Sequence, residues 1–312
     1  MPGNGSWILK DIAWIAVDWG TSNLRVWGLN ADSQLVAEAS SDQGMAKLDR
    51  SGFEPALLAL TSDWLPPDRR TPVIACGMVG ARQGWVEVPY RQVPCKPVFF
   101  DAVGRPDTRD PRLSVFVLAG IKQIQPAPDV MRGEETQIAG FLREYPHFAG
   151  VLCLPGTHTK WVRINAGDIV HFRTFMTGEL FNLLSAHSVL RHSLSGNGSD
   201  PTEFAASVEA MAAEPAGLAA RLFSIRAQSL VSEFGPAIAA ARLSGLLIGA
   251  ELAAARDDWC NQAPTIVGNG PQSELYAEGL RVLGQAPRIV DASHVTLAGL
   301  KSAYLQIAKD FS

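Results

Sequence analysis

Four short segments of the sequence combine residue types that can bind phosphate or move a proton. In the first, Asp18–Arg25, an aspartate precedes glycine and hydroxyl residues. Glycine lets backbone N–H groups approach a phosphate closely, and hydroxyl groups add donors. A carboxylate at a strand end can hold magnesium, mainly through water because magnesium dehydrates reluctantly. The segment predicts either a phosphate-binding hairpin or a hairpin in which the aspartate only stabilises the turn. Residues expected at the site are Asp18 (metal ligand and catalytic), Gly20, Thr21, Ser22 and Arg25.

The second segment, Leu154–Lys160, has the same chemistry in the other half of the chain. It predicts a second phosphate clamp, to which a histidine or a lysine adds positive charge. The alternative is a plain hairpin with a solvated lysine. The residues expected to contact phosphate are Gly156, Thr157, His158 and Lys160.

The third segment, Arg132–Gln137, places two neighbouring carboxylates, Glu134 and Glu135, at the start of a predicted helix. The positive end of the helix dipole favours their ionised forms, as a magnesium ligand or a general base requires. Acidic residues are also common stabilisers of a first helical turn, so a purely structural role is the alternative.

The fourth segment is the turn Gly268, Asn269 and Gly270, between a predicted strand and a predicted helix. Such a turn can bring backbone against an adenosine or a phosphate. It is not the dinucleotide-binding fingerprint, because Ser273 stands where that pattern needs glycine or alanine. The sequence also has no GxxxxGK[ST] loop, so any ATP site is not of the P-loop type.

The elements around these segments repeat. Apolar runs at 14–17 and 151–154 each lead into a Gly-Thr turn, and a second strand follows at 24–29 and at 161–164. This repetition predicts two duplicated α/β domains, with coincidence as the alternative, since strand–Gly–strand is common. Further strands are expected at 35–39, 73–76, 114–118, 168–172, 265–267 and 288–290, and helices at 55–65, 134–144, 179–191, 203–213, 237–256, from 272, and at 296–309.

The bulk composition excludes several classes of protein. The 312 residues are 47% hydrophobic and 19% charged, with a net charge of −4. Nothing here favours a nucleic-acid partner, which would need a basic stripe. The longest apolar stretch, 243–255, is shorter than the roughly 20 residues that cross a bilayer and contains Glu251. With no signal peptide and four scattered cysteines, we expect a cytoplasmic protein with reduced thiols and no membrane partner.

Together, in this order, the four segments resemble those of the superfamily of sugar kinases, heat-shock chaperones and actin. The sequence is more closely similar to the 2-dehydro-3-deoxygalactonokinase family, over about residue 13 to the C-terminus. The similarity is carried by six blocks, at residues 17–25, 76–80, 130–137, 155–162, 172–179 and 243–251.

This resemblance implies an α/β fold of two ribonuclease-H-like domains of the actin/hexokinase type, with an interdomain nucleotide cleft. The implied domains are residues 1–147 and 148–295, and a closing helix at 296–312 packs back on the first. The implied reaction uses ATP and Mg²⁺ to phosphorylate the 6-hydroxyl of 2-dehydro-3-deoxy-D-galactonate, in the De Ley–Doudoroff route.

The resemblance also suggests residue roles. Glu134-Glu135-Thr136 is similar to the Asn-Asp-Thr triplet of hexokinases, whose Asp is the general base, which places Glu135 at the base position. Glutamate replaces aspartate here, so Glu134 remains a rival. The candidates for binding the sugar acid are Arg82, Arg132, Arg173 and Glu179, and we favour Arg82 because planar, bidentate carboxylate binding suits arginine and nearby glycines admit a ligand.

Three alternatives stay open at this point. The first is a kinase for another acid, such as 2-dehydro-3-deoxygluconate. The second is a non-catalytic nucleotide- or sugar-binding regulator, although Asp18 and the acidic pair are present. The third is a cytoskeletal or chaperone ATPase, for which the chain is short. A homodimer is an option that the sequence does not decide.

Overall fold

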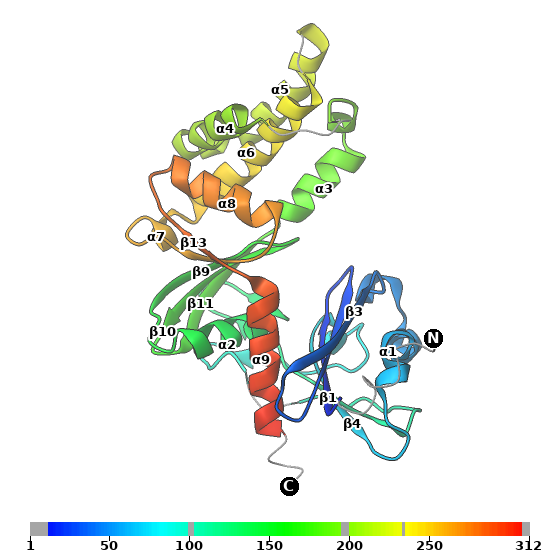
Figure 1. Cartoon of the computed structure of the whole chain (residues 1–312). Coiled ribbons are helices and arrows are strands. Elements are labelled where there is room, and N and C mark those ends of the chain that lie inside the picture. The colour runs from blue at the N-terminus through cyan, green and yellow to red at the C-terminus, as the bar shows by residue number, and fades with distance from the viewer. Residues whose placement is uncertain (1–11, 99–102, 195–199, 233–234, 308–312) are drawn as a thin grey trace, which may run out of the picture. The chain divides into compact units, whose positions relative to one another are not determined.

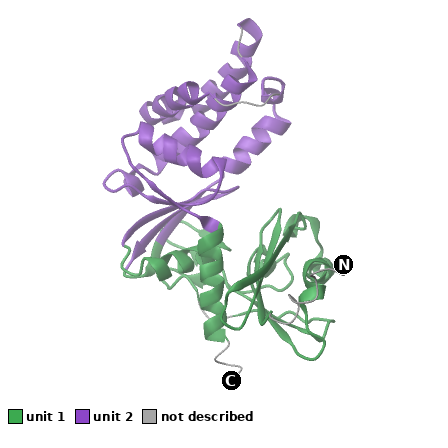
Figure 2. Cartoon of the chain, in the orientation of Figure 1, with its two compact units in different colours: residues 1–148, 166–170, 293–312 green, residues 149–165, 171–292 purple. Residues whose placement is uncertain are grey.

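The computed structural model describes residues 12–98, 103–194, 200–232 and 235–307. The chain divides into two compact units (Figure 2). Unit 1 comprises residues 1–148, 166–170 and 293–312, and unit 2 comprises residues 149–165 and 171–292. Each unit is described below by itself.

Unit 1 is built on a five-stranded sheet in the order β3-β2-β1-β4-β6 (Figure 1). Strand β1 pairs antiparallel with β2 and parallel with β4. Strand β2 pairs antiparallel with β3, and β4 pairs parallel with β6. The strands are β1 (Trp14–Trp19), β2 (Leu24–Leu29), β3 (Leu35–Ser41), β4 (Thr71–Gly77) and β6 (Leu113–Val117).

Alternation along β1 divides the core of unit 1 between the two faces of this sheet. Val17 and Trp19 pack with Phe53 of helix α1 (Phe53–Thr61) on one face. Trp14 and Ala16 pack on the other face against helix α9 (Ala292–Ile307). Because side chains alternate along a strand, Asp18 shares the α9 face at the end of β1. A small sheet of β5 (Arg91–Gln92), β7 (Ile121–Gln123) and β8 (Asp129–Met131) completes the unit.

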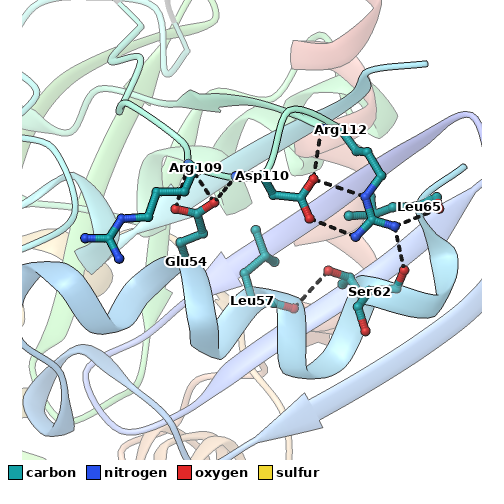
Figure 3. Close-up of polar contacts among 8 residues, drawn as sticks. Glu54, Leu57, Ser62, Leu65, Arg109, Asp110 and Arg112 are labelled. Carbon is teal, nitrogen blue, oxygen red and sulfur yellow. Dashed lines mark hydrogen bonds and ion pairs between the residues drawn. The ribbon is translucent and has the colours of Figure 1, made fainter. Parts of the chain in front are cut away.

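Helix α1 is fixed at both ends to the segment that leads into β6 (Figure 3). The buried carboxylate of Glu54 accepts the backbone N–H groups of Arg109, at 2.9 and 3.0 Å, and of Asp110, at 2.7 Å. Beyond the other end of the helix, after a short 3-10 helix (Ser62–Trp64), the guanidinium of Arg112 donates to the carbonyl oxygen of Leu65 at 3.3 Å. These polar contacts hold α1 against the sheet in addition to its apolar packing.

Helices α2 (Glu134–Glu144) and α9 touch through their backbones. A Cβ added to Gly140 would lie 1.8 Å from the carbonyl oxygen of Val295, and one added to Gly299 would lie 2.1 Å from that of Thr136. Real Cβ atoms do not approach so closely, so both positions require glycine. This close contact between α2 and α9 fixes the position of the start of α2, where the two acidic residues lie.

Unit 2 repeats the sheet of unit 1, in the order β11-β10-β9-β12-β13. Its first strand pairs antiparallel with the second and parallel with the fourth, as in unit 1. The strands are β9 (Gly150–Leu154), β10 (Thr159–Asn165), β11 (Asp168–Phe175), β12 (Thr265–Val267) and β13 (Arg288–Val290). The shared order confirms the predicted duplication and the ribonuclease-H-like domains that the resemblance implies.

Helices cover the sheet of unit 2 and include its most apolar segment, α6. This helix is long and apolar enough to cross a membrane by length and composition, but more than half of the stretch is buried inside the protein. It is the core helix of the unit. The helices are α3 (Thr177–His187), α4 (Pro201–Ala213), α5 (Leu218–Val231), α6 (Pro236–Ala254), α7 (Arg256–Trp259) and α8 (Pro271–Val282).

The sequence-based expectations differ from these elements in several places. Strands β5, β7 and β8 and helix α7 were not predicted, and α9 begins at Ala292 instead of at residue 296. Helix α5 was not predicted, because its apolar residues form no single stripe: Ile225 is buried, whereas Phe223 and Val231 are exposed. The helix expected at 179–191 begins two residues earlier and ends at His187, and a short 3-10 helix (Val189–His192) follows.

Candidate active site

The first predicted phosphate segment forms the turn between β1 and β2. The side chains of Thr21 and Ser22 are exposed there. The carbonyl oxygens of Gly20 and Thr21 accept the backbone N–H groups of Met45 and Ala46, each at 3.0 Å. These backbone hydrogen bonds therefore fix the turn, while its hydroxyl groups remain accessible to a ligand.

Asp18 and Arg25 form an ion pair beside this turn. Nη2 of Arg25 lies 2.5 Å from Oδ2 of Asp18, whose side chain is 15% exposed. Nη1 of Arg25 donates to the hydroxyl of Ser293 in α9 at 2.9 Å. The pair orients the carboxylate so that its second oxygen, Oδ1, makes a long contact, at 3.9 Å, with the thiol of Cys76.

The thiol of Cys76 lies between Asp18 and the start of α2. Burial raises the pKa of this thiol, and the charges of Asp18 and Glu135 raise it further. The thiol therefore stays neutral. Cys76, which was not among the residues predicted for the site, thus lies near both Asp18 and Glu135.

Glu135 is fully buried in this cluster. Its carboxylate accepts the backbone N–H of Gly133 at 2.7 Å and the hydroxyl of Thr136 at 3.1 Å. Burial raises the pKa of Glu135 to about 8, and the negative charge of Glu134 contributes. Glu134 is half-buried, and its Oε2 accepts the backbone N–H of Arg132 at 3.0 Å. The two carboxylates thus have different environments.

The cluster suits magnesium by the chemistry of its donors. Among the residues that the structure describes, no group of three His, Cys, Asp or Glu is placed to hold a metal ion. Magnesium in kinases needs no such group, because one or two carboxylates, waters and the phosphates of the substrate provide its oxygen ligands. Asp18 provides one carboxylate oxygen that is outside its ion pair.

The three candidate arginines have different surroundings. Arg173 pairs with Asp258 at 2.5 Å. The buried guanidinium of Arg132 donates to the carbonyl oxygen of Val88 at 2.7 Å and lies 4.2 Å from the ring centroid of Tyr90. Its Nε and Nη1 have no hydrogen-bond partner within the described part of the chain. Arg82 is exposed, on the loop that follows β4.

The second predicted phosphate segment forms the turn between β9 and β10 in unit 2. Thr157 and His158 are exposed, and Lys160 is buried instead of solvated. Nε2 of His158 lies 2.5 Å from Oε2 of Glu179. Glu179, predicted to bind substrate, therefore contacts the phosphate turn directly.

The predicted glycine turn leads from β12 into α8. The side chain of Asn269 accepts the backbone N–H of Ala292 at 2.7 Å and donates to Asp291 at 3.0 Å. Gly268 donates its N–H to Val290 at 3.0 Å, and Gly270 precedes α8 with a φ of 70°. The side chain of Asn269 thus connects this turn to the end of unit 2.

A cavity of about 280 Å³ lies beside both of these segments in unit 2. Thr157 of the phosphate turn and Gln272 of α8 line it, and Nε2 of Gln272 donates to the carbonyl oxygen of Gly156 at 2.9 Å. Of the lining residues only Thr157 was predicted from the sequence, because the pattern of a helix does not distinguish a pocket wall from core. The others include Thr177, Phe181, Ser244, Leu247 and Tyr276.

A larger, open cavity of about 900 Å³ in unit 1 lies beside α1. Arg50, Trp85, Arg105 and Arg109 are among the residues that line it. None of the residues predicted for the site is among them. We therefore take the cluster around Asp18 in unit 1 and the cavity of unit 2 as two separate candidate sites, and do not choose by cavity size.

Comparison with known proteins identifies close relatives. The model of the family described as 2-keto-3-deoxy-galactonokinase matches residues 18–303. A Rhizobium meliloti (strain 1021) protein named probable 2-dehydro-3-deoxygalactonokinase is 38% identical over 294 residues, which are 92% of this chain and 95% of that protein. The Escherichia coli (strain K12) 2-dehydro-3-deoxygalactonokinase is 35% identical over 296 residues, with coverage of 93% and 96%. A solved Sinorhizobium meliloti structure given the same enzyme name has a TM-score of 0.85 at 36% identity, covering 94% of this chain and 99% of its own.

The raised pKa of Glu135 predicts how pH affects stability. Below pH 4.5 the side chain is neutral in the folded and unfolded states. Between that pH and about 8 the unfolded chain ionises while the folded protein keeps its proton, so the free energy of unfolding falls as pH rises. We expect Glu135→Gln, which is always neutral, to melt at a higher temperature than wild type at pH 8 and at a similar temperature at pH 5. A melting difference independent of pH would contradict the raised pKa.

Proposed function

The chain belongs to the 2-keto-3-deoxy-galactonokinase family and is a carbohydrate kinase, and from this premise we propose its reaction and the residues that carry it. ATP transfers its terminal phosphate to the 6-hydroxyl of 2-dehydro-3-deoxy-D-galactonate, giving ADP and 2-dehydro-3-deoxy-6-phospho-D-galactonate. The observation that supports this assignment is the cluster of Asp18, Cys76 and Glu135, where the ends of β1 and β4 meet the start of α2. The reaction takes place in the cytoplasm.

In this proposal Asp18 would hold the magnesium ion that neutralises the charge of the phosphates. Magnesium, when bound, neutralises the β- and γ-phosphates, and phosphoryl transfer depends mostly on such neutralisation and on positioning. The ion pair with Arg25 keeps one oxygen of Asp18 oriented, which leaves Oδ1 for the metal or its waters. The exposed hydroxyls of Thr21 and Ser22 and the backbone at Gly20 contact phosphate oxygens.

Glu135 is the general base. Its carboxylate accepts the proton of the 6-hydroxyl as the oxygen–phosphorus bond forms and the bond to ADP breaks. A pKa of about 8 lies close to an ordinary working pH, where a base is most effective. Because Glu135 is buried, this role requires that the bound hydroxyl reaches its carboxylate, and half-buried Glu134 is the alternative that the experiments below separate.

The cavity of unit 2 takes the adenosine. It combines apolar side chains such as Phe181 and Leu247 with a few hydroxyl and amide groups, as small-molecule sites usually do. Its wall includes Thr157, so a nucleotide seated in it has its phosphates beside the second phosphate turn. Gly156, His158 and Lys160 then contact phosphate, and Gly268, Asn269 and Gly270 lie at the start of the helix that carries Gln272.

Arg82 binds the carboxylate of the sugar acid. Its side chain is exposed, and no hydrogen bond or ion pair engages its guanidinium among the described residues, so the planar fork is available to a ligand. Arg173 is occupied by Asp258, and Arg132 by Val88 and Tyr90. The unpaired N–H groups of Arg132 make it the second choice.

A coupled ADP-release assay over C6 2-keto-3-deoxy acids tests the reaction. The galactonate-derived acid should give the highest kcat/KM. A higher kcat/KM with the gluconate-derived acid would favour the alternative substrate. The absence of turnover with every acid, together with retained ADP binding, would instead favour a regulator. Size-exclusion chromatography with light scattering would decide whether the protein is a monomer or a homodimer.

The role of Asp18 predicts a selective loss of turnover. Asp18→Asn keeps the shape but removes the charge, so we expect kcat to fall at least about a hundredfold, since removal of a general charge-stabilising group typically costs that much. The melting temperature should change little, because the partly exposed pair with Arg25 contributes only about 0–1 kcal/mol. Turnover is measured across magnesium concentrations. Asp42→Asn, in an exposed pair with Lys47, is the matched control. Normal turnover of Asp18→Asn would remove Asp18 from this role.

The role of Glu135 predicts both a rate and a pH profile. Glu135→Gln should lower kcat at least about a hundredfold, the usual contribution of a general base. Wild-type kcat/KM should rise with pH up to about 8, because only the ionised carboxylate accepts a proton. Glu134→Gln removes a charge that raises this pKa, so its profile should level off at a lower pH. An inactive Glu134→Gln beside an active Glu135→Gln would reverse the two roles.

The role of Arg82 predicts a change confined to one substrate. Arg82→Ala should raise the KM for the sugar acid about tenfold or more, the effect of losing hydrogen bonds to a charged group, and leave the KM for ATP unchanged. Steady-state kinetics with each substrate varied in turn measures this. Arg132→Ala and Arg173→Ala are tested in parallel. A rise in sugar-acid KM in one of these variants, with Arg82→Ala unaffected, would assign the carboxylate to that arginine instead.

A further inference from the structure

One buried carboxylate of unit 2 has no role in the mechanism above. Glu251 lies in the apolar helix α6 and is 3% exposed. A buried charge is unfavourable unless hydrogen bonds compensate for the lost water. Its position in a core helix therefore calls for an explanation.

Three neutral donors from three different elements bind Glu251. The indole N–H of Trp161, from β10, donates to Oε1 at 2.7 Å. The hydroxyl of Tyr276, from α8, donates to Oε2 at 2.6 Å, and so does the hydroxyl of Thr177, at the start of α3. Glu251 thus ties strand β10 and helices α3 and α8 to α6.

The carboxylate also sets the direction of a longer hydrogen-bond chain. The hydroxyl of Tyr276 uses its single proton to donate to Glu251. The hydroxyl of Thr159, 2.8 Å from that of Tyr276, must then donate to Tyr276. Thr159 begins β10, directly after the second phosphate turn. The carboxylate of Glu251 therefore orients the hydroxyls of Thr177, Tyr276 and Thr159.

The elements held by Glu251 are those that form the cavity and the phosphate turn. Thr177 and Tyr276 line the cavity. The first turn of α3 is also bound to the phosphate turn, because the N–H of Glu179 donates to the carbonyl oxygen of Thr157 at 2.9 Å. A Cβ on Gly178 would lie only 2.4 Å from the carbonyl oxygen of Gly156, so this contact is close.

We propose that Glu251 is a positioning residue of the nucleotide site. From behind the cavity, it fixes the wall residues Thr177 and Tyr276 and, through α3 and α8, the phosphate turn, in the arrangement that binds an adenine nucleotide. This inference rests on the proposed placement of adenosine in the cavity of unit 2. Glu251 touches no substrate in this proposal.

The first test measures ADP binding by isothermal titration calorimetry with magnesium present. Glu251→Ala should weaken ADP binding at least about tenfold, because the loss of a hydrogen-bonded charged group typically costs that much. The KM for the sugar acid should stay unchanged. Glu251→Gln keeps the shape and the contacts with all three elements, although its amide N–H groups donate to the two hydroxyls instead of accepting from them. Because the proposal rests on these contacts and not on their direction, this variant should bind ADP within about threefold of wild type. An unchanged ADP affinity in folded Glu251→Ala would overturn the proposal.

A matched variant separates positioning from general stability. Leu243→Ala, in the same helix but outside the cavity lining, should lower the melting temperature and leave ADP affinity unchanged. If Glu251→Ala does not fold, Tyr276→Phe decides, because it keeps the ring in the cavity wall and removes only the hydroxyl bound to Glu251. Tyr276→Phe should weaken ADP binding several-fold, and wild-type affinity would overturn the proposal.

A last variant shows whether a negative result overturns the role of Glu251 or the placement of the nucleotide in the cavity. Ser244→Phe fills the cavity and should abolish ADP binding. Retained binding would show that the cavity does not take the nucleotide, and the placement and the inference would both fail. Lost binding in Ser244→Phe, combined with normal binding in Glu251→Ala, would overturn the inference alone.

Discussion

The cluster in unit 1 depends on how closely helices α2 and α9 approach each other. At Gly140 and Gly299 the separation is set by backbone atoms, with no room for a methyl group. This contact fixes where α2 begins and therefore where Glu135 lies relative to the end of β1. Helix α9 also supplies Ser293, which holds Arg25 and through it Asp18. The last helix of the chain thus orients both acids of the proposed mechanism.

The two buried glutamates illustrate how partners decide what a carboxylate can do. Glu135 has two hydrogen-bond donors and a neighbouring negative charge, so the dominant effect of burial raises its pKa to about 8. Burial raises the pKa of Glu251 as well, but three donors oppose that effect. The first environment suits a group that exchanges a proton near neutral pH, and the second suits a fixed acceptor.

Local sequence patterns indicated the duplication of the two sheets, and the resemblance to a known family indicated their ribonuclease-H-like fold. The turns at Gly20 and Gly156 each join two adjacent strands, so their repetition revealed the duplicated sheets. Cys76 could not be assigned to the site, because its contacts with Asp18 and α2 arise only when distant segments pack. Ser244 was missed for another reason. The apolar pattern of α6 indicates core along the whole helix, so it does not show which residues line a cavity.

The burial of Glu135 has a consequence for the choice between water and sugar as acceptor of the phosphate. A carboxylate that is buried and has a pKa of about 8 is mostly protonated at neutral pH and is shielded from bulk solvent. ATP bound alone would then meet no effective base. A sugar hydroxyl, held by contacts along the rest of the acid, can approach the carboxylate because binding free energy offsets the rearrangement that this needs. In the proposed mechanism, the desolvation that lowers the stability of the folded protein above pH 4.5 also favours transfer to the sugar over hydrolysis.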